Sequence, residues 1–428
     1  MPARRKATKN PPSSSESLEL EISALGHLGD GIAHLEGQTI FVPYSAPGDR
    51  LIVRLEGERE GGRLARIERH LADGPDRVQP PCIHFGDCGG CALQHLSAPA
   101  YSAWKQALVG DALARQGVAA QVSAMVAIPP GSRRRATFIA ERRGGDVHIG
   151  FNALGSSRIV DLSLCHILLP ALVDLLVPLR STLVRVLGGN ETADIAATAS
   201  DSGIDLWLKT RNRLSLAARE ALVAFAEQYD LARISAGADA EPVALRRQPQ
   251  MNFSGVAVAL PPDSFLQPSA GGQAALVALV GEALAGRKRV ADLYAGCGTF
   301  TFALMAGRRV HAVEGNAASL AALAAAARGS GGRVTSERRD LAREPLTALE
   351  LNKFDAVVFD PPRAGAKEQA AEIARSKLKL AVAVSCNPVS FARDARILGD
   401  AGFRLAKVTP VDQFPWSAHL ELVGVFSR

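Results

Sequence analysis

Cys386 is the residue of this chain whose type and position point most directly to chemistry. It stands between Ser385 and Asn387, directly after the apolar run Leu380–Ser385. That run predicts a buried strand, so the cysteine is expected where a strand gives way to a loop. Thiolates are strong nucleophiles, although an isolated buried cysteine often only packs in the interior. The position favours a covalent catalyst over a packing residue.

A glycine-rich loop lies upstream of this cysteine. The apolar run Arg289–Leu293 predicts a strand, and it is followed by Tyr294, by a loop that contains Gly296 and Gly298, and then by a helical pattern. Glycines in such a loop let a ligand approach the backbone at the N-terminus of the following helix. The loop therefore predicts a site for a nucleotide-like cofactor.

Acidic residues follow the loop at spacings that narrow the choice of cofactor. Asp292 lies in the strand before the loop, Glu314 ends the next predicted strand, and Asp340 ends a third. An acidic side chain after the second strand would accept hydrogen bonds from ribose hydroxyls, and Asp340 could meet an adenine amino group. Because the loop lacks the full glycine pattern of a dinucleotide site, the ordered set favours S-adenosylmethionine over NAD.

The sequence Asp360-Pro-Pro-Arg363 follows another apolar run, at the sheet edge where ligands of α/β folds bind. A thiol beside a methyl donor suits one reaction in particular. Carbon 5 of uracil is a poor nucleophile until a thiolate adds to carbon 6, and a base must later remove the carbon 5 proton. Glu421, which precedes the apolar run Leu422–Phe426, is the candidate base, and His419 is the second candidate.

Four other cysteines form a spaced set: Cys82, Cys88, Cys91 and Cys165. Four thiolates suit either a [4Fe–4S] cluster or structural zinc. Zinc ribbons usually show two close pairs, so a triplet with one distant thiol favours the iron–sulfur cluster, and zinc stays open. The expected role is structural, since methyl transfer needs no electron.

The chain alternates between patterns typical of different folds. After about residue 250, apolar runs alternate with alanine-rich helical stretches, which predicts a doubly wound parallel α/β sheet. Leu18 to about Arg69 contains short strands separated by glycine and proline turns, which predicts a small β-barrel of the OB type. This segment is rich in arginine, which favours RNA contact over a barrel that only packs against its neighbour. Residues 1–16 predict a basic disordered tail.

The charge is compatible with a polyanionic partner, with a formal net charge of +6 and a pI of about 9.1. Arg133, Arg134 and Arg135 form a basic patch that would contact RNA phosphates. The sequence shows neither an apolar run long enough for a membrane span nor a secretory signal, so a cytoplasmic protein is expected.

With these motifs in place, the chain resembles the RNA (uracil-5-)-methyltransferases, and within them the cluster-containing branch that acts on large-subunit ribosomal RNA. The resemblance implies an N-terminal TRAM barrel, a central cluster-bearing domain and a C-terminal Rossmann-like methyltransferase domain. It implies that Gln267, in Phe265-Leu266-Gln267, contacts the cofactor, and that Tyr294, Glu314, Asp340 and Asp360 line its site. It also implies Cys386 as nucleophile, Glu421 as base and Cys82, Cys88, Cys91 and Cys165 as cluster ligands.

The implied domain division assigns 17–72 to the TRAM-like barrel and 73–98 with 125–250 to a central α+β domain. The ranges 99–124 and 251–428 then form the methyltransferase domain. Two departures from the family pattern concern the cofactor site. Ser269 stands where Asn is frequent, and the loop reads Tyr294-Ala-Gly-Cys-Gly-Thr299 where the family usually has Tyr-Cys-Gly-x-Gly-Asn.

Three alternatives remain at this point. The same reaction could act on transfer RNA. The protein could be an RNA-binding or assembly factor with a silent methyltransferase domain, although Cys386 and Glu421 are both intact. It could also methylate an exocyclic amine, a reaction that needs no thiol and whose sites usually place an aromatic residue where this chain has Arg363. The target base must be unstacked to reach a buried thiol, so a loop in the RNA is expected as the substrate.

Overall fold

The structure is a computed structural model in which residues 17–428 are described. The basic tail predicted over residues 1–16 lies outside the described residues. The chain forms two compact units. Of the described residues, the first contains 17–86 with Gly90–Trp104 and Trp416–Ala418, and the second contains Asp87–Gly89, Lys105–Pro415 and His419–Arg428.

The first unit contains one mixed sheet in the order β1-β5-β6-β4-β3-β2. Its strands are β1 (Ser17–Glu21), β2 (Ala24–Leu25), β3 (Gly31–Leu35), β4 (Gln38–Val42), β5 (Arg50–Arg59) and β6 (Gly62–Ala72). Alternate residues of these strands, such as Leu51, Val53 and Leu55, turn inward onto a shared core. The predicted OB-like fold is confirmed, with β3 as a strand that the glycine-rich sequence around it had hidden.

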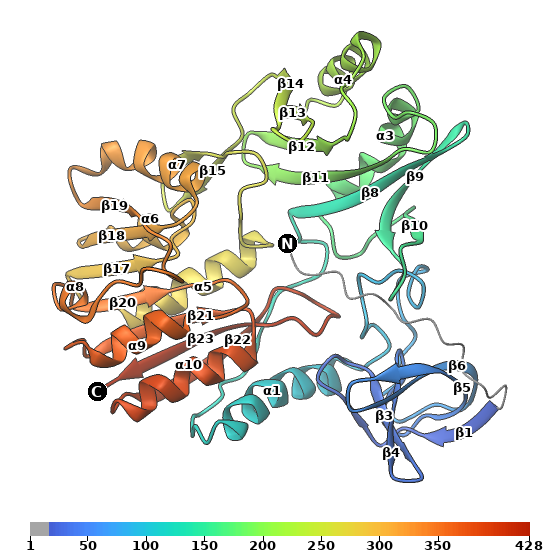
Figure 1. Ribbon diagram of the computed structural model, residues 1–428, viewed down its shortest axis with the longest axis horizontal. Coiled ribbons are helices and arrows are strands. Elements are labelled where there is room, and N and C mark those ends of the chain that lie inside the picture. The colour runs from blue at the N-terminus through green and yellow to red at the C-terminus, as the bar shows by residue number, and fades with distance from the viewer. Residues whose placement is uncertain (1–16) are drawn as a thin grey trace. The chain divides into compact units, whose positions relative to one another are not determined.

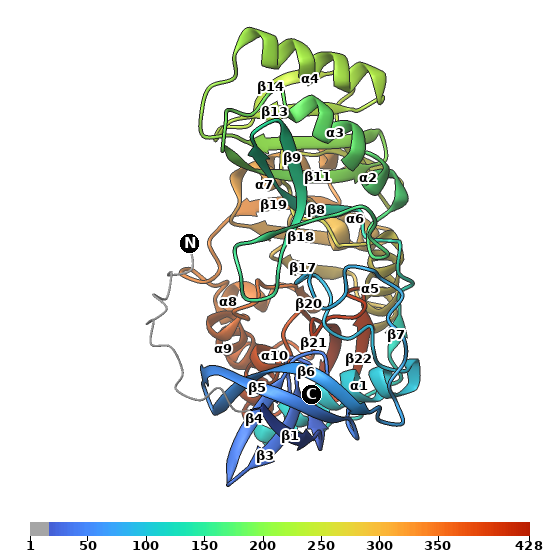
Figure 2. The ribbon, with the colours of Figure 1, turned by 90° about the vertical axis from the view of Figure 1, so that its right-hand side faces the viewer.

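The second unit contains a sheet in the order β10-β9-β8-β11-β12-β13-β14. Its strands are β8 (Arg135–Arg143), β9 (Asp146–Asn152), β10 (Ile159–Asp161), β11 (Thr192–Ser200), β12 (Gly203–Lys209), β13 (Arg233–Ala236) and β14 (Glu241–Leu245). The helices α2 (Pro170–Asp174), α3 (Leu176–Leu183) and α4 (Leu216–Gln228) bury their apolar side chains against it. Figure 2 shows α3 beside β9 and β11.

The same unit contains a second sheet in the order β19-β18-β17-β20-β21-β23-β22-β7. Its strands are β7 (Val126–Ala127), β17 (Arg289–Leu293), β18 (Arg309–Glu314), β19 (Val334–Arg338), β20 (Ala356–Phe359), β21 (Leu380–Ser385), β22 (Arg404–Asp412) and β23 (Glu421–Ser427). From β19 to β21 neighbouring strands are parallel, whereas β23 is antiparallel to β21 and to β22. The Rossmann-like fold is confirmed, and the antiparallel hairpin β22–β23 is the part that strand patterns did not reveal.

Helices cover both faces of this sheet (Figure 1). One face packs against α9 (Lys367–Arg375), α10 (Pro388–Asp400) and part of α1 (Ala98–Arg115). The other face packs against α5 (Ala270–Ala283) and α6 (Thr299–Leu304). Successive strand residues alternate between the two cores, as Val290 and Ala291 do, because side chains of a strand point to opposite faces. Both faces of the sheet are covered by helices and excluded from water, which explains why the strands consist of continuous apolar runs.

Three further helices and one hairpin complete the described elements: α7 (Ala317–Ala327), α8 (Ala348–Leu351), the 3₁₀ helix Arg328–Ser330, and the hairpin β15 (Gln250–Phe253) with β16 (Val256–Ala259). Helix α1 ends at Arg115, and Gly117 with a φ of 66° follows its end. Within residues 17–428, no helix is both long and apolar enough to cross a membrane.

Candidate active site

Strand register places Cys386 and Glu421 next to each other at one edge of the second sheet. Ser385, the last residue of β21, pairs with Leu422 in the antiparallel strand β23. Cys386 follows Ser385 and Glu421 precedes Leu422, so both residues lie one step beyond this pair. Burial and then the charge of Glu421 raise the pKa of Cys386, which also indicates that the two groups lie close together. The candidate nucleophile and the candidate base therefore share one end of the sheet.

The residues around Cys386 form a tight turn that ties two loops together. Asn387 caps α10, since its side chain accepts a hydrogen bond from the Val389 amide at 3.1 Å. The same side chain donates to the Arg363 carbonyl at 3.0 Å, and Ser390 donates to that carbonyl at 3.1 Å. The Asp360–Arg363 loop is thereby fixed to the turn that carries the thiol.

Glu421 is 4% exposed, and a buried lysine holds the loop that leads to it. The Lys105 ammonium is fully buried and pairs with Asp412 at 2.5 Å. It also donates to the carbonyls of Phe414 at 3.1 Å and His419 at 2.7 Å. His419 itself is exposed, whereas Glu421 faces the protein interior.

Two glutamines link the carboxyl groups of Asp360 and Glu421. The side chain of Gln267 donates to Asp360 Oδ2 at 3.2 Å and accepts from Gln413 Nε2 at 2.7 Å. Gln413 also hydrogen-bonds Glu421, which opposes the rise of its pKa. An amide NH₂ carries two donors, so Gln413 can serve both partners. A Cβ at position 272 would lie 2.3 Å from Gln413 Oε1, which explains the glycine there.

Arg134 supports this glutamine pair. The guanidinium is 4% exposed and donates to the Gln267 carbonyl at 2.9 Å and to Gln273 at 2.7 Å. Arg133 donates to the Arg135 carbonyl, and Arg135 pairs with Asp263 at 3.3 Å. The predicted phosphate contact by Arg134 needs correction, because a buried guanidinium bound to protein oxygens cannot present its charge to RNA. Phosphate contacts by Arg133 and Arg135 stay predictions.

The glycine loop has the backbone geometry that a bound cofactor would need. Gly296 has a φ of 56°, and a Cβ added there would meet no atom within 4 Å. Tyr294 adopts a φ of 61°, a strained conformation for a non-glycine residue, and such strain is concentrated at functional sites. Glu314 is fixed by the amides of Gly296 at 2.8 Å and Asn316 at 2.6 Å. Asp340 is exposed and accepts from the Ala342 amide.

The departure at Ser269 has a structural explanation. Ser269 is the N-cap of α5, where its hydroxyl accepts a hydrogen bond from the Gly272 amide at 3.0 Å. The second departure places Cys297 in the glycine loop, where it is 3% exposed and packs in an apolar core. Burial raises the pKa of this thiol, so it behaves as a packing residue.

Burial raises the pKa of every carboxyl group at the centre of the site. The pKa of Asp292 rises to about 7, as does that of Asp360, although Asp360 keeps some solvent-exposed surface. The pKa of Glu421 also lies well above its usual range, because of burial and then the charge of Asp360. Burial, Glu421 and Asp360 together raise the pKa of Cys386 to about 11. The site favours neutral acids and a protonated thiol when no ligand is bound.

Several buried acceptors at the site are available to a ligand. Within residues 17–428, no hydrogen-bond partner meets Oδ1 of Asp292, Oε1 of Gln413 or Oε2 of Glu421. Orphaned buried acceptors are rare in folded proteins and are costly unless a donor arrives. S-adenosylmethionine carries an amino group, ribose hydroxyls and a positive sulfonium, so its chemistry fits this acidic, acceptor-rich site.

The four spaced cysteines divide between the two units. Cys82 and Cys91 belong to the first, and Cys88 and Cys165 to the second. Cys88 pairs with Ala153 beside β9, and both Cys88 and Cys165 pack on the core beneath that sheet. The Cys82 amide donates to Gln94 at 3.2 Å. A shared metal site for the four thiols stays a prediction.

Sequence reasoning missed Lys105 and Gln413. Lys105 lies within α1, and a lysine in a helix is normally interpreted as solvent-exposed. Nothing in the neighbouring sequence reveals its partner 307 positions away. Gln413 follows Asp412 in the run Val411-Asp-Gln-Phe414, whose pattern resembles an ordinary strand end. Only the tertiary fold brings either residue to the site.

Comparisons with known proteins agree with this geometry. Residues 251–428 match the family model described as tRNA (Uracil-5-)-methyltransferase, and residues 16–60 match the TRAM domain. An uncharacterized RNA methyltransferase of Mesorhizobium japonicum is 42% identical over 96% of this chain and 98% of its own length. The 23S rRNA (uracil(1939)-C(5))-methyltransferase of Shewanella piezotolerans is 31% identical over 96% of each chain.

Among solved structures, the fold is similar to that of the Pyrococcus abyssi tRNA (uracil-54, C5)-methyltransferase in complex with S-adenosyl-L-homocysteine. The TM-score is 0.75 at 23% identity, and the match covers 95% of this chain and 99% of that one. At this identity the likeness concerns the fold.

The raised pKa of Asp292 predicts how stability depends on pH. A carboxyl whose pKa is higher in the folded than in the unfolded state adds stability that is complete below pH 4 and is lost as pH rises toward 7. Asp292→Asn keeps an acceptor for Thr301 but does not titrate. We expect the free energy of unfolding of Asp292→Asn, relative to that of the unmodified protein, to be about 2–3 kcal/mol higher at pH 8 than at pH 5. Urea unfolding at the two pH values measures this difference.

The matched control is Asp146→Asn, which removes an exposed carboxylate from the first residue of β9. It should leave the pH dependence unchanged. If Asp292→Asn and the unmodified protein lose stability in parallel between pH 5 and pH 8, Asp292 is already ionised in the fold.

Proposed function

The chain belongs to the RNA (uracil-5-)-methyltransferase family, and from this premise we propose that it forms 5-methyluridine in large-subunit ribosomal RNA. The observation that carries the reaction is the register of β21 and β23, which sets Cys386 beside Glu421. Support for the RNA class comes from the relative of Shewanella piezotolerans, which is named for uracil in 23S rRNA and matches over nearly the full length. We propose a cytoplasmic location, where such RNA is found.

In the proposed reaction Cys386 forms a bond from sulfur to carbon 6 of the target uracil, and the ring becomes an enolate. The thiol reacts as a thiolate, so its proton must leave first, against a pKa of about 11 in the free protein. S-adenosylmethionine, when bound, supplies a methyl group on a positive sulfonium. That charge beside Asp360 and Glu421 would favour their ionised forms and so ready Glu421 to act as a base.

Carbon 5 of the enolate would form a bond to this methyl group, and the electrons of the broken methyl–sulfur bond would stay on the departing thioether. Glu421 then removes the proton from carbon 5. The electrons of that C–H bond restore the ring double bond as the bond from carbon 6 to sulfur breaks, and Cys386 returns to its starting state. The proton passes from Glu421 to solvent, which balances the loss of the sulfonium charge. Glu421 is better placed for this role than His419, because Glu421 is buried at the edge that carries Cys386, whereas His419 is exposed.

We propose that the cofactor is held by seven residues of the second unit: Gln267, Tyr294, Gly296, Gly298, Glu314, Asp340 and Asp360. The open space at Gly296 and the fixed carboxylate of Glu314 support this assignment. Gly298 has a separate reason to be glycine, since its φ is 100° and a Cβ there would lie 2.5 Å from Phe302.

We propose that four cysteines bind a [4Fe–4S] cluster, with zinc as the alternative metal. These ligands are Cys82, Cys88, Cys91 and Cys165. Support comes from the donor set, since four thiols match the ligand number and type of either group. Cys88 and Cys165 flank the same apolar core, so a metal bound there would brace that sheet. The cluster would be structural, because the proposed methyl transfer moves no electron.

The direct test is nucleoside mass spectrometry on ribosomal RNA from cells that lack this gene. We expect 5-methyluridine to appear after treatment with the protein and S-adenosylmethionine. Cys386→Ala should reduce the rate by roughly 10³-fold or more, because the ring carbon is then not activated. Cys297→Ala is the matched control and should remain active.

Transfer RNA from the same cells distinguishes the substrate classes. Methylation of transfer RNA alone would overturn the ribosomal proposal while leaving the chemistry intact. RNA that contains 5-fluorouridine should form a covalent adduct that survives denaturation, because fluorine blocks the final proton removal. A silent domain or an amine methyltransferase would give no adduct.

Gln413 should control how readily Glu421 acts as a base. Gln413→Met removes the hydrogen bond that favours the charged carboxylate, so the pKa of Glu421 should rise further. A rise of one pH unit would slow proton removal about tenfold on the acid side of the profile. The expected signs are a shift of the acid limb of kcat to higher pH and accumulation of the methylated adduct with ordinary uridine RNA.

The control for this variant is Gln369→Met, which removes another buried amide, one that hydrogen-bonds Leu346 away from the site. A loss of activity without adduct and without a shifted profile would mean that Gln413 acts only on folding or on cofactor binding.

The metal proposal is tested on protein purified without oxygen. We expect about four iron atoms and four acid-labile sulfides per chain with a broad visible absorption band. Cys165→Ser should lose both iron and the band, whereas Cys297→Ala should keep them. Stoichiometric zinc with no iron would replace the cluster by a structural zinc site.

A further inference from the structure

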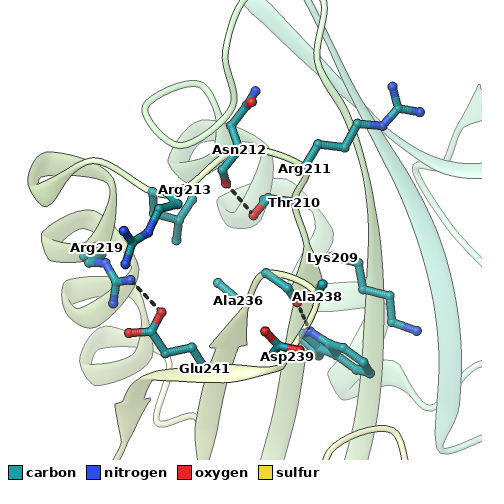
Figure 3. A pocket seen from close by; sticks show the side chains of 13 residues that line it. Lys209, Thr210, Arg211, Asn212, Arg213, Arg219, Ala236, Ala238, Asp239 and Glu241 are labelled. Carbon is teal, nitrogen blue, oxygen red and sulfur yellow. Dashed lines mark hydrogen bonds and ion pairs between the residues drawn. The ribbon is translucent and has the colours of Figure 1, made fainter.

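A pocket of about 700 Å³ opens in the second unit, beside β12 and β13 of the sheet that runs from β10 to β14 (Figure 3). It lies where β12 and β13 end. These two strands are parallel and are joined through α4, so their carboxyl ends meet at the same edge. In parallel α/β units this edge is where ligands bind. Neither the proposed catalytic residues nor the four cysteines line this pocket.

Cations outnumber carboxylates around the pocket. Its lining includes Lys209, Arg211, Arg213 and Arg219 against Asp239 and Glu241. Arg219 is already paired with Glu241 at 2.9 Å, and Lys209 with Asp263 at 2.8 Å. Arg211 and Arg213 are both exposed, and within residues 17–428 neither forms an ion pair of 4 Å or less, although Arg219 and then the charge of Arg213 help to lower the pKa of Glu241. Figure 3 shows Arg213 on the same side of the pocket as Arg219.

The loop that carries these cations is held in place by its neighbours. Trp207 donates from Nε1 to the Gly237 carbonyl at 2.7 Å, which fixes the turn after β13. The Lys209 ammonium lies 4.3 Å from the centre of the Trp207 ring. Thr210 is buried and donates to the Asn212 carbonyl at 3.1 Å. The two uncommitted guanidinium groups therefore extend from a backbone that is already ordered.

One carboxylate connects the pocket with the segment that holds Gln267. Asp263 pairs with Lys209 and also with Arg135 at 3.3 Å. Lys209 and Arg135 are therefore joined through the carboxylate of Asp263, and Asp263 precedes Gln267 by only four residues.

We propose that this pocket, through Arg211 and Arg213, binds the sugar–phosphate backbone of the RNA substrate at nucleotides away from the methylated uridine. Figure 3 shows the two exposed guanidinium groups extending to different sides of the loop, so each can bind a separate phosphate of the strand through the planar fork of arginine. A buried small anion is a poorer match, because Asp239 and Glu241 also face the pocket. The contact carries no sequence information and would set register and affinity.

The test measures binding of a fluorescent oligouridylate to the full-length protein at several salt concentrations. An oligouridylate reports backbone contacts whichever RNA is the natural substrate, so the result does not depend on the ribosomal proposal. Arg211→Ala/Arg213→Ala should raise Kd about tenfold at low salt and lower the slope of log K against log salt by about 1.4, the value for two phosphates of a single strand. Arg211→Gln/Arg213→Gln should do the same.

The matched control is Arg404→Ala/Lys407→Ala, which removes two exposed charges from β22 of the same unit. It changes net charge equally but should leave the slope unchanged. If both double variants weaken binding alike, the effect is one of net charge, and the pocket proposal fails. It fails as well if Arg211→Ala/Arg213→Ala binds the oligouridylate as the unmodified protein does. A thermal midpoint within a few degrees of the unmodified protein shows that a weakened variant is still folded.

Discussion

The site depends on keeping several carboxyl groups out of water at one edge of a parallel sheet. Asp292 lies within β17, Glu421 begins β23 and Asp360 directly follows β20, so their positions are set by the backbone. Burial disfavours three neighbouring negative charges, and the free protein responds by raising their pKa values. A ligand that brings positive charge relieves this cost, which makes the acidic edge selective for a cation such as a sulfonium.

The polar contacts around this edge explain residues that otherwise look unrelated. Gln267 and Gln413 couple two carboxyls through one amide pair, and Arg134 holds the backbone of Gln267 from the neighbouring sheet. Lys105 is buried at the other side, where it pairs with Asp412 and fixes the loop before Glu421. Removing one partner of such a pair leaves a buried charge uncompensated, so these residues are constrained by the site they support.

Sequence reasoning reached most of the fold because both faces of the second sheet are dry. Strands such as Ala356–Phe359 then consist of consecutive apolar residues, and the polar residue after each strand marks the functional edge. The hairpin β22–β23 escaped notice because antiparallel pairing depends on register between segments, which a single segment does not encode. Arg134 was misjudged for a related reason, since a basic run does not reveal which of its members turns inward.

The distribution of charge favours different binding positions for the cationic methyl donor and for the polyanionic RNA. The centre of the site is acidic and dry, where a cationic methyl donor is favoured and a phosphate is repelled. The cations lie outside it, at Arg135, Lys209, Arg211 and Arg213, on exposed or half-buried positions of the neighbouring sheet. If these cations hold the RNA backbone as proposed, the backbone stays outside the acidic centre, and an uncharged base is the part of the RNA that can reach Cys386. Since uracil is neutral, it can enter an acidic pocket that its own backbone cannot, and base extrusion follows from electrostatics as well as from shape.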